Sequence, residues 1–465
     1  MERTSTNRRR GNRTGIEENT LAIVESTEAK DTQDADDDRI SFLEAVRASS
    51  FASEVAVPPT NKMYEAVLQI LRVGKSLELI MSSYQLLIDL DKHFPQVFVS
   101  KSHELVVVDE AWSPFAFSSD VTSNESRAAG ENSSGLLDFS GFALLIEELV
   151  EIATVENLRA MDTKNLRNML LFQYLVSFLE GDFLPRKTMY AETMNWTILR
   201  ESFLNMLLGS RRINYKNLMK DCLSILCGLS QVYTGMSDNR GSPENSNTKP
   251  SEDCNPALAF ALLQVGKSTC IAMQKFLIII MGLDNSKKNA DMQGQTTRAD
   301  GVRTPVVEIV LDELTYNVDM LLPFLQAFNQ PKWKLEIVVQ YFSKYTTKPS
   351  VRTRRSNGPV DDATFTGILN WFSSSTGTKS ILKKISIQVI QLLLAHGFQA
   401  LLLLSSQNIE GVMDSKEETR ESSLVEICKS MICAFQSLKR TNEEMEILPI
   451  SKEALFTAAT ILSMN

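Results

Sequence analysis

The chain has 465 residues, of which 43% are hydrophobic, and its 57 acidic and 48 basic side chains give a formal net charge of −9. That composition allows a sizeable buried core, and the acidic balance argues against non-specific nucleic-acid binding by the surface as a whole. Only 20 Gly and 14 Pro occur, which favours helices over turn-rich β folds.

The N-terminal tail comes before the first predicted helix. Residues 1–14 are polar and basic, residues 25–38 are acidic, and neither segment has enough apolar content to bury. We therefore expect residues 1–37 to be mostly disordered. Asp38 is the predicted N-cap of a helix near 39–49.

Long amphipathic segments alternate with polar breaks from Asn61 onward. Thr60 or Asn61 can cap a helix, and Thr304 precedes Pro305 at the first position of another. We predict helices near 39–49, 61–93, 136–156, 162–181, 188–209, 213–233, 256–284, 303–328, 331–346, 378–405, 421–439 and 451–463. The breaks predict polar, mobile insertions near 118–135, 235–256, 285–301, 346–360 and 410–423.

Helices in series, without convincing βαβ units, predict an all-α fold. We expect residues 38–465 to form one armadillo/HEAT-like helical solenoid with degenerate repeats, since no clean sequence repeat is visible. An irregular helical bundle is the alternative. LVVVDE (105–110) is the one segment expected to be extended. The longest apolar stretch, 387–404, is interrupted by Gln and His, so we interpret it as a buried helix and expect no membrane span.

Two segments resemble the end of a phosphate-binding loop, LQILRVGKS (68–76) and LLQVGKST (262–269), and LVVVDE resembles a magnesium-holding strand. A working loop needs a first Gly five residues before the second, but those positions hold Gln69 and Ala261. Apolar residues also keep helical spacing through Gly74 and Gly266, which predicts continuous helices that cannot cradle a phosphate. We therefore interpret both motifs as accidental.

Other catalytic and metal-binding patterns are absent from the sequence. There is no Gly-x-Ser-x-Gly elbow and no His-Glu-x-x-His, and the three histidines are too dispersed for a metal site. None of the six cysteines forms a Cys-x-x-Cys pair, and the N-terminus does not resemble a signal peptide, so we expect reduced thiols in the cytosol or nucleus. Cys222/Cys227 and Cys428/Cys433 suit core packing. We expect no catalytic residue, no metal, no cofactor and no small-molecule substrate.

Two basic clusters stand out against the acidic background. The first comprises Arg8, Arg9, Arg10 and Arg13, which is either a solvated tail or a nuclear localisation signal. The second lies within 331–355, where Lys348, Arg352, Arg354 and Arg355 occupy a loop and aromatic residues are interleaved upstream. It is either a basic loop beside core aromatics or a patch for DNA phosphate or an acidic partner. Lys379, Lys383 and Lys384 follow.

Several long segments resemble one family in the same order along the chain. They are VVDEAWSPF (107–115), ETMNWTILRESFLNMLL (192–208), DGVRTPVVEIVLDELTY (300–316), PKWKLEIVVQYFSKY (331–345), KPSVRTRR (348–355) and EILPISKEALFTA (446–458). They are similar to the plant negative regulators of systemic acquired resistance, the suppressors of inducible defence expression. The resemblance runs from about Glu17 to the C-terminus and is weakest at 235–256 and in the N-terminal tail.

The resemblance implies a nuclear, armadillo-like scaffold without enzymatic activity that represses pathogenesis-related genes through chromatin. It also implies the non-SMC element six role in the structural-maintenance-of-chromosomes (SMC) five/six complex, beside an element-five-like subunit, in DNA-damage response and homologous recombination. Contact with DNA would be direct or through partners. The alternatives are a nucleotide hydrolase that uses 69–76 and 105–110, and an armadillo-type transport adaptor.

Overall fold

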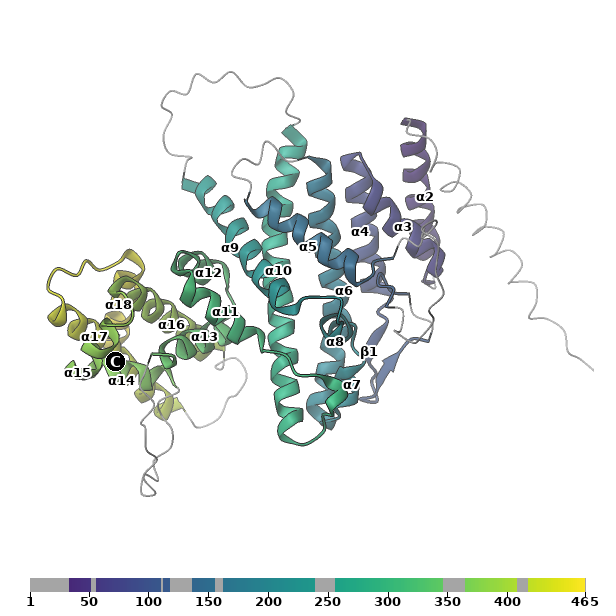
Figure 1. Cartoon of the computed structure of the whole chain (residues 1–465). Coiled ribbons are helices and arrows are strands. Elements are labelled where there is room, and N and C mark those ends of the chain that lie inside the picture. Colours follow the sequence, from purple (N-terminus) through teal and green to yellow (C-terminus); the bar gives the residue numbers. More distant parts are fainter. Residues whose placement is uncertain are drawn as a thin grey trace, which may run out of the picture. The chain divides into compact units, whose positions relative to one another are not determined.

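The computed structural model describes residues 33–51, 56–109, 112–117, 136–154, 162–238, 256–345, 364–407 and 417–464, and these residues are mainly helical (Figure 1). The described residues contain seventeen α-helices and two short strands, β1 (Val97–Val99) and β2 (Leu105–Val107). The strands form an antiparallel hairpin in which Phe98 faces Val106, so Leu105–Val107 of the LVVVDE segment are extended as predicted. The all-α prediction is confirmed, whereas the degenerate repeats stay a prediction.

The chain divides into two compact units near Val306, where the sequence led us to expect a single array over 38–465. The first unit contains ten helical elements among its described residues. They are α2 (Gln33–Phe51), α3 (Asn61–Val73), α4 (Leu77–His93), α5 (Phe139–Thr154), α6 (Thr163–Thr193), α7 (Trp196–Arg200), α8 (Phe203–Gly209), α9 (Tyr215–Asp238), α10 (Pro256–Met292) and the 3-10 helix η3 (Arg298–Asp300).

The two longest helices, α6 and α10, pack along each other at the centre of the first unit, with α5 and α9 beside them. Phe172 on α6 and Phe276 on α10 meet edge to face at 6.1 Å, and both are fully buried. Buried Gln173 donates to the Val265 carbonyl and the Thr269 hydroxyl of α10. This polar contact fixes the register of two otherwise apolar helices.

The first helix of the second unit is α11 (Val306–Tyr316). The boundary between the units follows its first residue, Val306. The remaining elements of the second unit are η4 (Val318–Met320), α12 (Leu321–Ala327), α13 (Pro331–Ser343), α14 (Phe365–Ser373), α15 (Ser375–Leu382), α16 (Ile387–Gln407), α17 (Glu417–Thr441) and α18 (Pro449–Met464). Helix α16 packs against α13 and α18, and α14 packs against α17.

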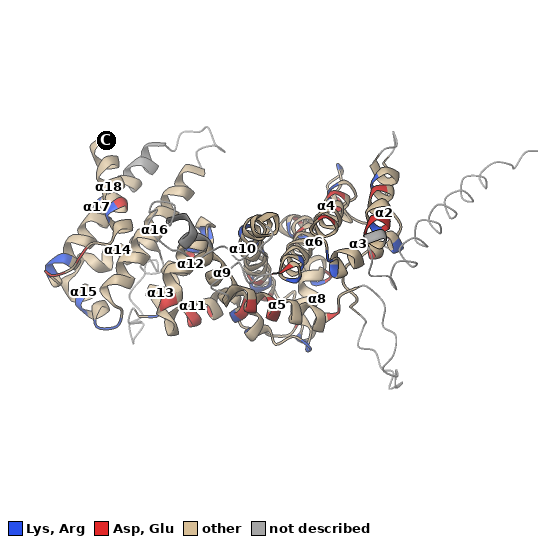
Figure 2. Cartoon of the chain, turned by 90° about the horizontal axis from the view of Figure 1, so that it is seen from above, with Lys and Arg blue, Asp and Glu red and all other residues tan. Residues whose placement is uncertain are grey.

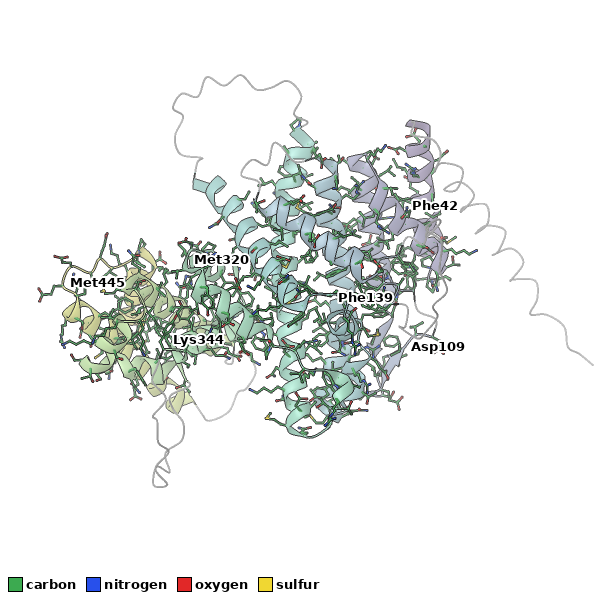
Figure 3. The ribbon with its side chains drawn as sticks, in the orientation of Figure 1. Phe42, Asp109, Phe139, Met320, Lys344 and Met445 are labelled. Atoms are coloured by element: carbon green, nitrogen blue, oxygen red, sulfur yellow. The ribbon has the colours of Figure 1, made fainter. Side chains whose placement is uncertain are left out.

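Apolar side chains fill the interior of both units, and Figure 3 draws the side chains on the ribbon. Phe42 on α2 is fully buried in the first unit, and Met445 is buried before α18 in the second. The buried amide of Gln391 on α16 donates to the Glu446 carbonyl at 2.9 Å and accepts from the Leu448 N–H at 3.0 Å. The segment that leads into α18 is thereby fastened to the core.

Several helix boundaries differ from the prediction. The helix predicted over 61–93 breaks at Gly74, and the one over 188–209 becomes the end of α6, α7 and α8. The insertion predicted at 285–301 is structured, because α10 runs to Met292 and η3 follows. Helix α14 was not predicted. Asp38 is not an N-cap, since α2 already begins at Gln33 and Asp38 lies inside it.

Two helices, α10 and α16, are long and apolar enough to span a membrane by length and composition alone. Helix α10 packs against α6 and α9, and α16 packs against α13 and α18. Core helices pass the same test of length and composition, and this packing fits our interpretation of 387–404 as a buried helix. The absence of a membrane span stays a prediction.

Candidate interaction surface and polar network

The residues that the sequence singled out as sites lie outside the described residues. This holds for the predicted localisation signal, Arg8, Arg9, Arg10 and Arg13, and for the predicted patch, Lys348, Arg352, Arg354 and Arg355. The structure does describe Tyr345, the residue that comes just before the segment with Lys348, Arg352, Arg354 and Arg355. The main-chain oxygen of Tyr345 accepts a hydrogen bond of 2.9 Å from Nζ of Lys384, so this lysine lies at the base of the basic segment.

The aromatic residues of α13, just before that segment, serve the core, and two of the nearby lysines already have partners. Trp333, Tyr341 and Phe342 are buried, so these aromatics are not a surface for stacking bases. Burial lowers the pKa of Lys334 to about 8, and its ammonium donates to the Leu325 carbonyl at 2.7 Å. Lys344 forms an ion pair with Asp312. These lysines therefore contribute little free charge to a patch.

The first Gly-Lys-Ser motif lies between two helices and not within one, which corrects our prediction. Helix α3 ends at Val73, and Ser76 caps α4 by accepting a hydrogen bond from the Leu79 N–H. The Gly74 carbonyl accepts a hydrogen bond from Arg167 at 3.2 Å. A phosphate-binding loop needs a strand before it, but here the preceding element is α3. The second motif does lie inside a helix, since Gly266 is buried within α10.

No group of three or more His, Cys, Asp or Glu that could hold a metal ion occurs among the residues that the structure describes. Cys222, Cys227 and Cys428 are buried, as a packing role predicts, whereas Cys433 is exposed. Burial raises the pKa of the Cys227 thiol to about 12, which keeps it protonated and unreactive at neutral pH.

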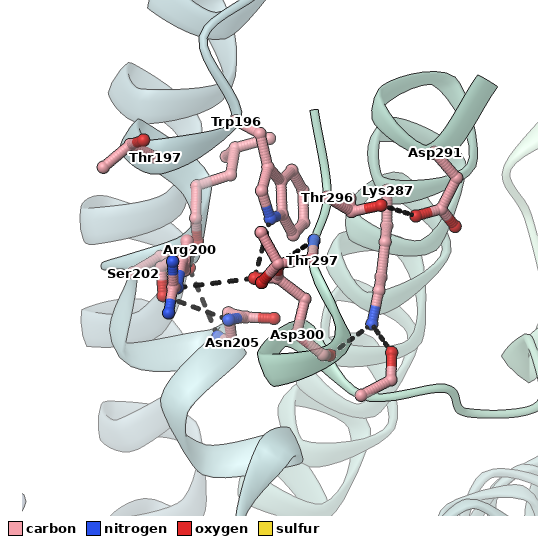
Figure 4. A network of polar contacts seen from close by, with 12 residues as sticks. Trp196, Thr197, Arg200, Ser202, Asn205, Lys287, Asp291, Thr296, Thr297 and Asp300 are labelled. Carbon is pink, nitrogen blue, oxygen red and sulfur yellow. Dashed lines mark hydrogen bonds and ion pairs between the residues drawn. The ribbon is translucent and has the colours of Figure 1, made fainter. Parts of the chain in front are cut away.

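A polar network joins α7 to the segment after α10 (Figure 4). The indole of Trp196 donates to Oδ1 of Asp300, and Arg200 forms an ion pair with the same oxygen at 3.4 Å. The main chain and hydroxyl of Thr297 donate to the other oxygen at 2.7 and 2.9 Å. Burial alone would raise the pKa of Asp300, but these bonds and the Arg200 charge lower it overall.

Lys287 fastens the same segment to α10 from the other side (Figure 4). Its ammonium donates to the main-chain oxygens of Asp300 and Gly301 at 2.6 and 2.7 Å. Burial and the nearby charge of Arg303 lower the pKa of Lys287. The segment that the sequence predicts as a mobile insertion is therefore bonded along its length.

A second carboxylate, Asp284 on α10, holds the residues that lead into α11. It forms an ion pair with Arg303 at 2.8 Å and accepts the Val306 N–H at 2.8 Å. The Arg303 guanidinium lies over the Tyr215 ring, 5.3 Å from its centroid. The N–H of Val306 is thus satisfied by a carboxylate 22 residues earlier in the chain, and α11 begins at Val306 where the sequence predicts a start at Pro305.

A buried carboxyl lies near the C-terminal end of α4. Both carboxyl oxygens of Asp91, the Trp112 indole nitrogen and the Tyr174 hydroxyl are buried without a hydrogen-bond partner at normal distance. Burial raises the pKa of Asp91 to about 7, although the Tyr174 hydroxyl opposes the rise. Asp91 also borders a cavity of about 500 Å³ that is lined by the end of α4, the residues that lead into β1, β1 itself and the middle of α6.

Sequence reasoning missed Asp91, Asp284, Lys287 and Asp300, because isolated charged residues resemble solvated helix faces. The available signal was weak in each case. Asp300 and Trp196 lie in segments that carry the family resemblance, and Asp284 ends a long apolar run of α10. Local spacing cannot reveal partners that are tens to a hundred residues apart.

Comparison with known proteins agrees with the resemblance found in the sequence. Residues 89–330 match the SNI1 middle domain family, and residues 346–465 match the SNI1 C-terminal domain family. The chain is 47% identical over 452 residues to the negative regulator of systemic acquired resistance SNI1 from Arabidopsis thaliana, covering 96% of this chain and 94% of that protein. No solved structure matches at a significant level. On these grounds the chain belongs to the SNI1 family.

Proposed function

We propose that this protein is a repressor of plant defence genes that acts as a nuclear, non-enzymatic scaffold. The observation that carries the proposal is the 47% identity, along 96% of the chain, to a protein named as a negative regulator of systemic acquired resistance. The charged groups Asp284, Lys287 and Asp300 bond to the chain's own backbone and side chains, so these three groups serve the fold.

Expression in Arabidopsis thaliana plants that lack the related protein tests the repressor role. The expected result is that defence-gene transcripts in unchallenged plants return to their low level. If the transcripts stay high although the protein accumulates in nuclei, the proposed repressor role is wrong. A fluorescent fusion in which Arg8, Arg9 and Arg10 are replaced by alanine tests the localisation signal, and we expect it to leave the nucleus.

We further propose that the protein is a subunit of the SMC five/six complex in DNA-damage repair and homologous recombination, beside an element-five-like subunit. This proposal rests on the resemblance of the long sequence segments. Affinity purification of the tagged full chain from nuclei, with identification of the proteins that co-purify, tests it. We expect the subunits of the complex to co-purify. If they do not, although the same tagged protein represses defence genes in the plant, then the protein is a repressor but not a subunit of this complex.

We propose that the basic segment with Lys348, Arg352, Arg354 and Arg355 contacts an acidic partner or DNA phosphate. Its base at Tyr345 lies beside Lys384, which adds positive charge there. Reversal of Arg352, Arg354 and Arg355 to glutamate should weaken binding and flatten its salt dependence, because fewer counterions are released. Binding that survives the reversal at physiological salt would contradict this proposal.

A nucleotide hydrolase is the less favoured alternative, since Gly74 joins two helices and Gly266 lies within one. An armadillo-type transport adaptor would share the fold and differ in its partners, so the same purification distinguishes it.

A further inference from the structure

We propose that a groove between α15 and the end of α17 docks an acidic segment of a partner protein that carries an apolar side chain between its carboxylates. We call it the basic groove, and it does not depend on which complex the protein joins. The groove has a volume of about 610 Å³. Its lining residues are Lys379, Leu382, Lys383, Ile387, Thr441, Asn442, Glu443 and Glu444.

Two lysines form one wall of the basic groove. Lys379 and Lys383 are four residues apart at the end of α15, so their side chains lie on the same face of the helix. Both are exposed, and neither side chain forms an ion pair or hydrogen bond with another residue in the described part of the chain. Carboxylates of a partner would find two ammonium groups within one helical turn of each other.

Further positive charge lies beside the groove, in the last turn of α17. Arg440 is exposed, and together with Lys439 and Glu443 it borders an adjoining hollow of about 370 Å³. Lys439 already donates to the Met445 carbonyl at 2.8 Å, so its role is partly structural. In Figure 2 the ribbon at α15 carries the colour of basic residues, on a chain whose overall charge is −9.

The lining between the charges selects a peptide over a nucleic acid. Leu382 and Ile387 offer carbon surface for one apolar side chain, and the Asn442 amide can pair with a peptide group. None of the described residues that line the groove is an aromatic side chain on which bases would stack. Glu443 and Glu444 would repel a continuous row of phosphates, but they tolerate a partner whose few carboxylates meet the lysine wall.

The peptide arm of the test measures fluorescence anisotropy with the full-length protein and a fluorescein-labelled decapeptide in which one leucine lies between two glutamates and the other residues are serine and glycine. The variant is Lys379→Glu with Lys383→Glu. The matched control is Lys429→Glu with Lys452→Glu, which makes the same charge change at exposed lysines outside the groove. Identical circular dichroism and melting temperatures establish that all three proteins are folded.

We expect the groove variant to lose at least about tenfold in affinity for the decapeptide, because two attractions become repulsions, whereas the control stays within about twofold of wild type. A decapeptide with serine in place of leucine should bind more weakly to wild type. Equal losses in the two variants, or no binding to wild type in the millimolar range, would overturn the proposal.

A fluorescein-labelled DNA duplex provides the second arm. If the duplex binds wild type more tightly than the decapeptide does, and if the groove variant alone loses that binding, then the groove holds phosphate and the peptide assignment is wrong. Duplex binding that is equal in the groove and control variants supports the peptide assignment, because it places DNA contact elsewhere on the chain.

Discussion

The indole Nε1 of Trp196 donates a hydrogen bond of 3.1 Å to Oδ1 of Asp300, a residue 104 positions further along the chain. Trp196 begins α7 and Asp300 ends η3, so this bond and the Lys287 bonds together close the segment after α10 onto the first unit. Both residues lie in segments that carry the family resemblance. Mutual contact between these segments thus helps to hold them in the conformation observed.

Removal of the indole donor should destabilise the protein in two measurable steps. Trp196→Phe keeps most of the apolar volume but leaves Asp300 short of a donor, and we expect a loss of about 1.5–3 kcal/mol in the free energy of unfolding. Trp196→Ala adds a cavity, for a loss of about 3–5 kcal/mol. Urea unfolding of both variants measures the losses. A Trp196→Phe protein as stable as wild type would mean that the hydrogen bond contributes nothing.

The buried carboxyl of Asp91 predicts a pH dependence of stability. Its folded-state pKa of about 7 lies above the ordinary 3.8, so between these values the folded protein binds a proton that the unfolded chain has lost. This contribution to stability is present below the unfolded pKa and is lost as the pH rises towards 7. Asp91→Asn should therefore gain stability relative to wild type as the pH rises from 4 to 7, with no further gain above that range.

Thermal unfolding of wild type and Asp91→Asn at a series of pH values measures this difference. Asp109→Asn is the matched control, because Asp109 is exposed at the end of the β hairpin. Melting temperatures of Asp91→Asn that run parallel to those of wild type across the range would show that the carboxyl is not protonated in the folded protein.

Much of the fold could be predicted from sequence, since amphipathic periodicity locates most long helices. The break at Gly74 was missed because apolar residues continue at helical spacing from Met63 to Leu87, although α3 and α4 are separate helices. Helix α14 was missed because it has only nine residues and follows a long polar stretch. The periodicity of apolar residues shows which side chains are buried. Because buried side chains can continue on both sides of a turn, this periodicity does not reveal where one helix ends and the next begins.

The polar network could not be predicted, because its geometry depends on residues distant in sequence. The ends of helices illustrate the limit. Thr60 caps α3 as its sequence predicts, whereas the N–H of Val306 is satisfied by Asp284 from another helix. A local cap can be inferred from neighbouring residues, but a tertiary cap requires the fold itself.

Substitutions in the two Gly-Lys-Ser/Thr motifs should separate a helix cap from a nucleotide site. Ser76→Ala removes the acceptor for the Leu79 N–H, for an expected loss of about 1 kcal/mol. Lys75→Ala and Lys267→Ala change exposed side chains and should alter stability by less than about 0.5 kcal/mol. Thermal unfolding of wild type and of the two lysine variants, with and without ATP and magnesium, tests whether either motif binds a nucleotide. A stabilisation by ATP that Lys75→Ala abolishes would contradict our interpretation.

Two glycines in long helices should respond in opposite ways to alanine. At Gly228 on α9, an added Cβ would lie 2.6 Å from the main-chain oxygen of Ala153 on α5, whereas at Gly181 on α6 it would meet nothing within 4 Å. Alanine gains about 1 kcal/mol over glycine in an open helix position. Gly181→Ala should therefore stabilise the protein by up to that amount.

Gly228→Ala gains the same helix propensity but must push α5 and α9 apart, and backbone shifts of this kind cost about 1–3 kcal/mol or more. We expect a lower melting temperature for Gly228→Ala and a higher one for Gly181→Ala. Because the chemical change is identical, the sign difference isolates the close approach of the two helices. If Gly228→Ala melts at or above the temperature of Gly181→Ala, then α5 and α9 are not in backbone contact at Ala153, and the packing of the first unit must be looser there than its structure indicates.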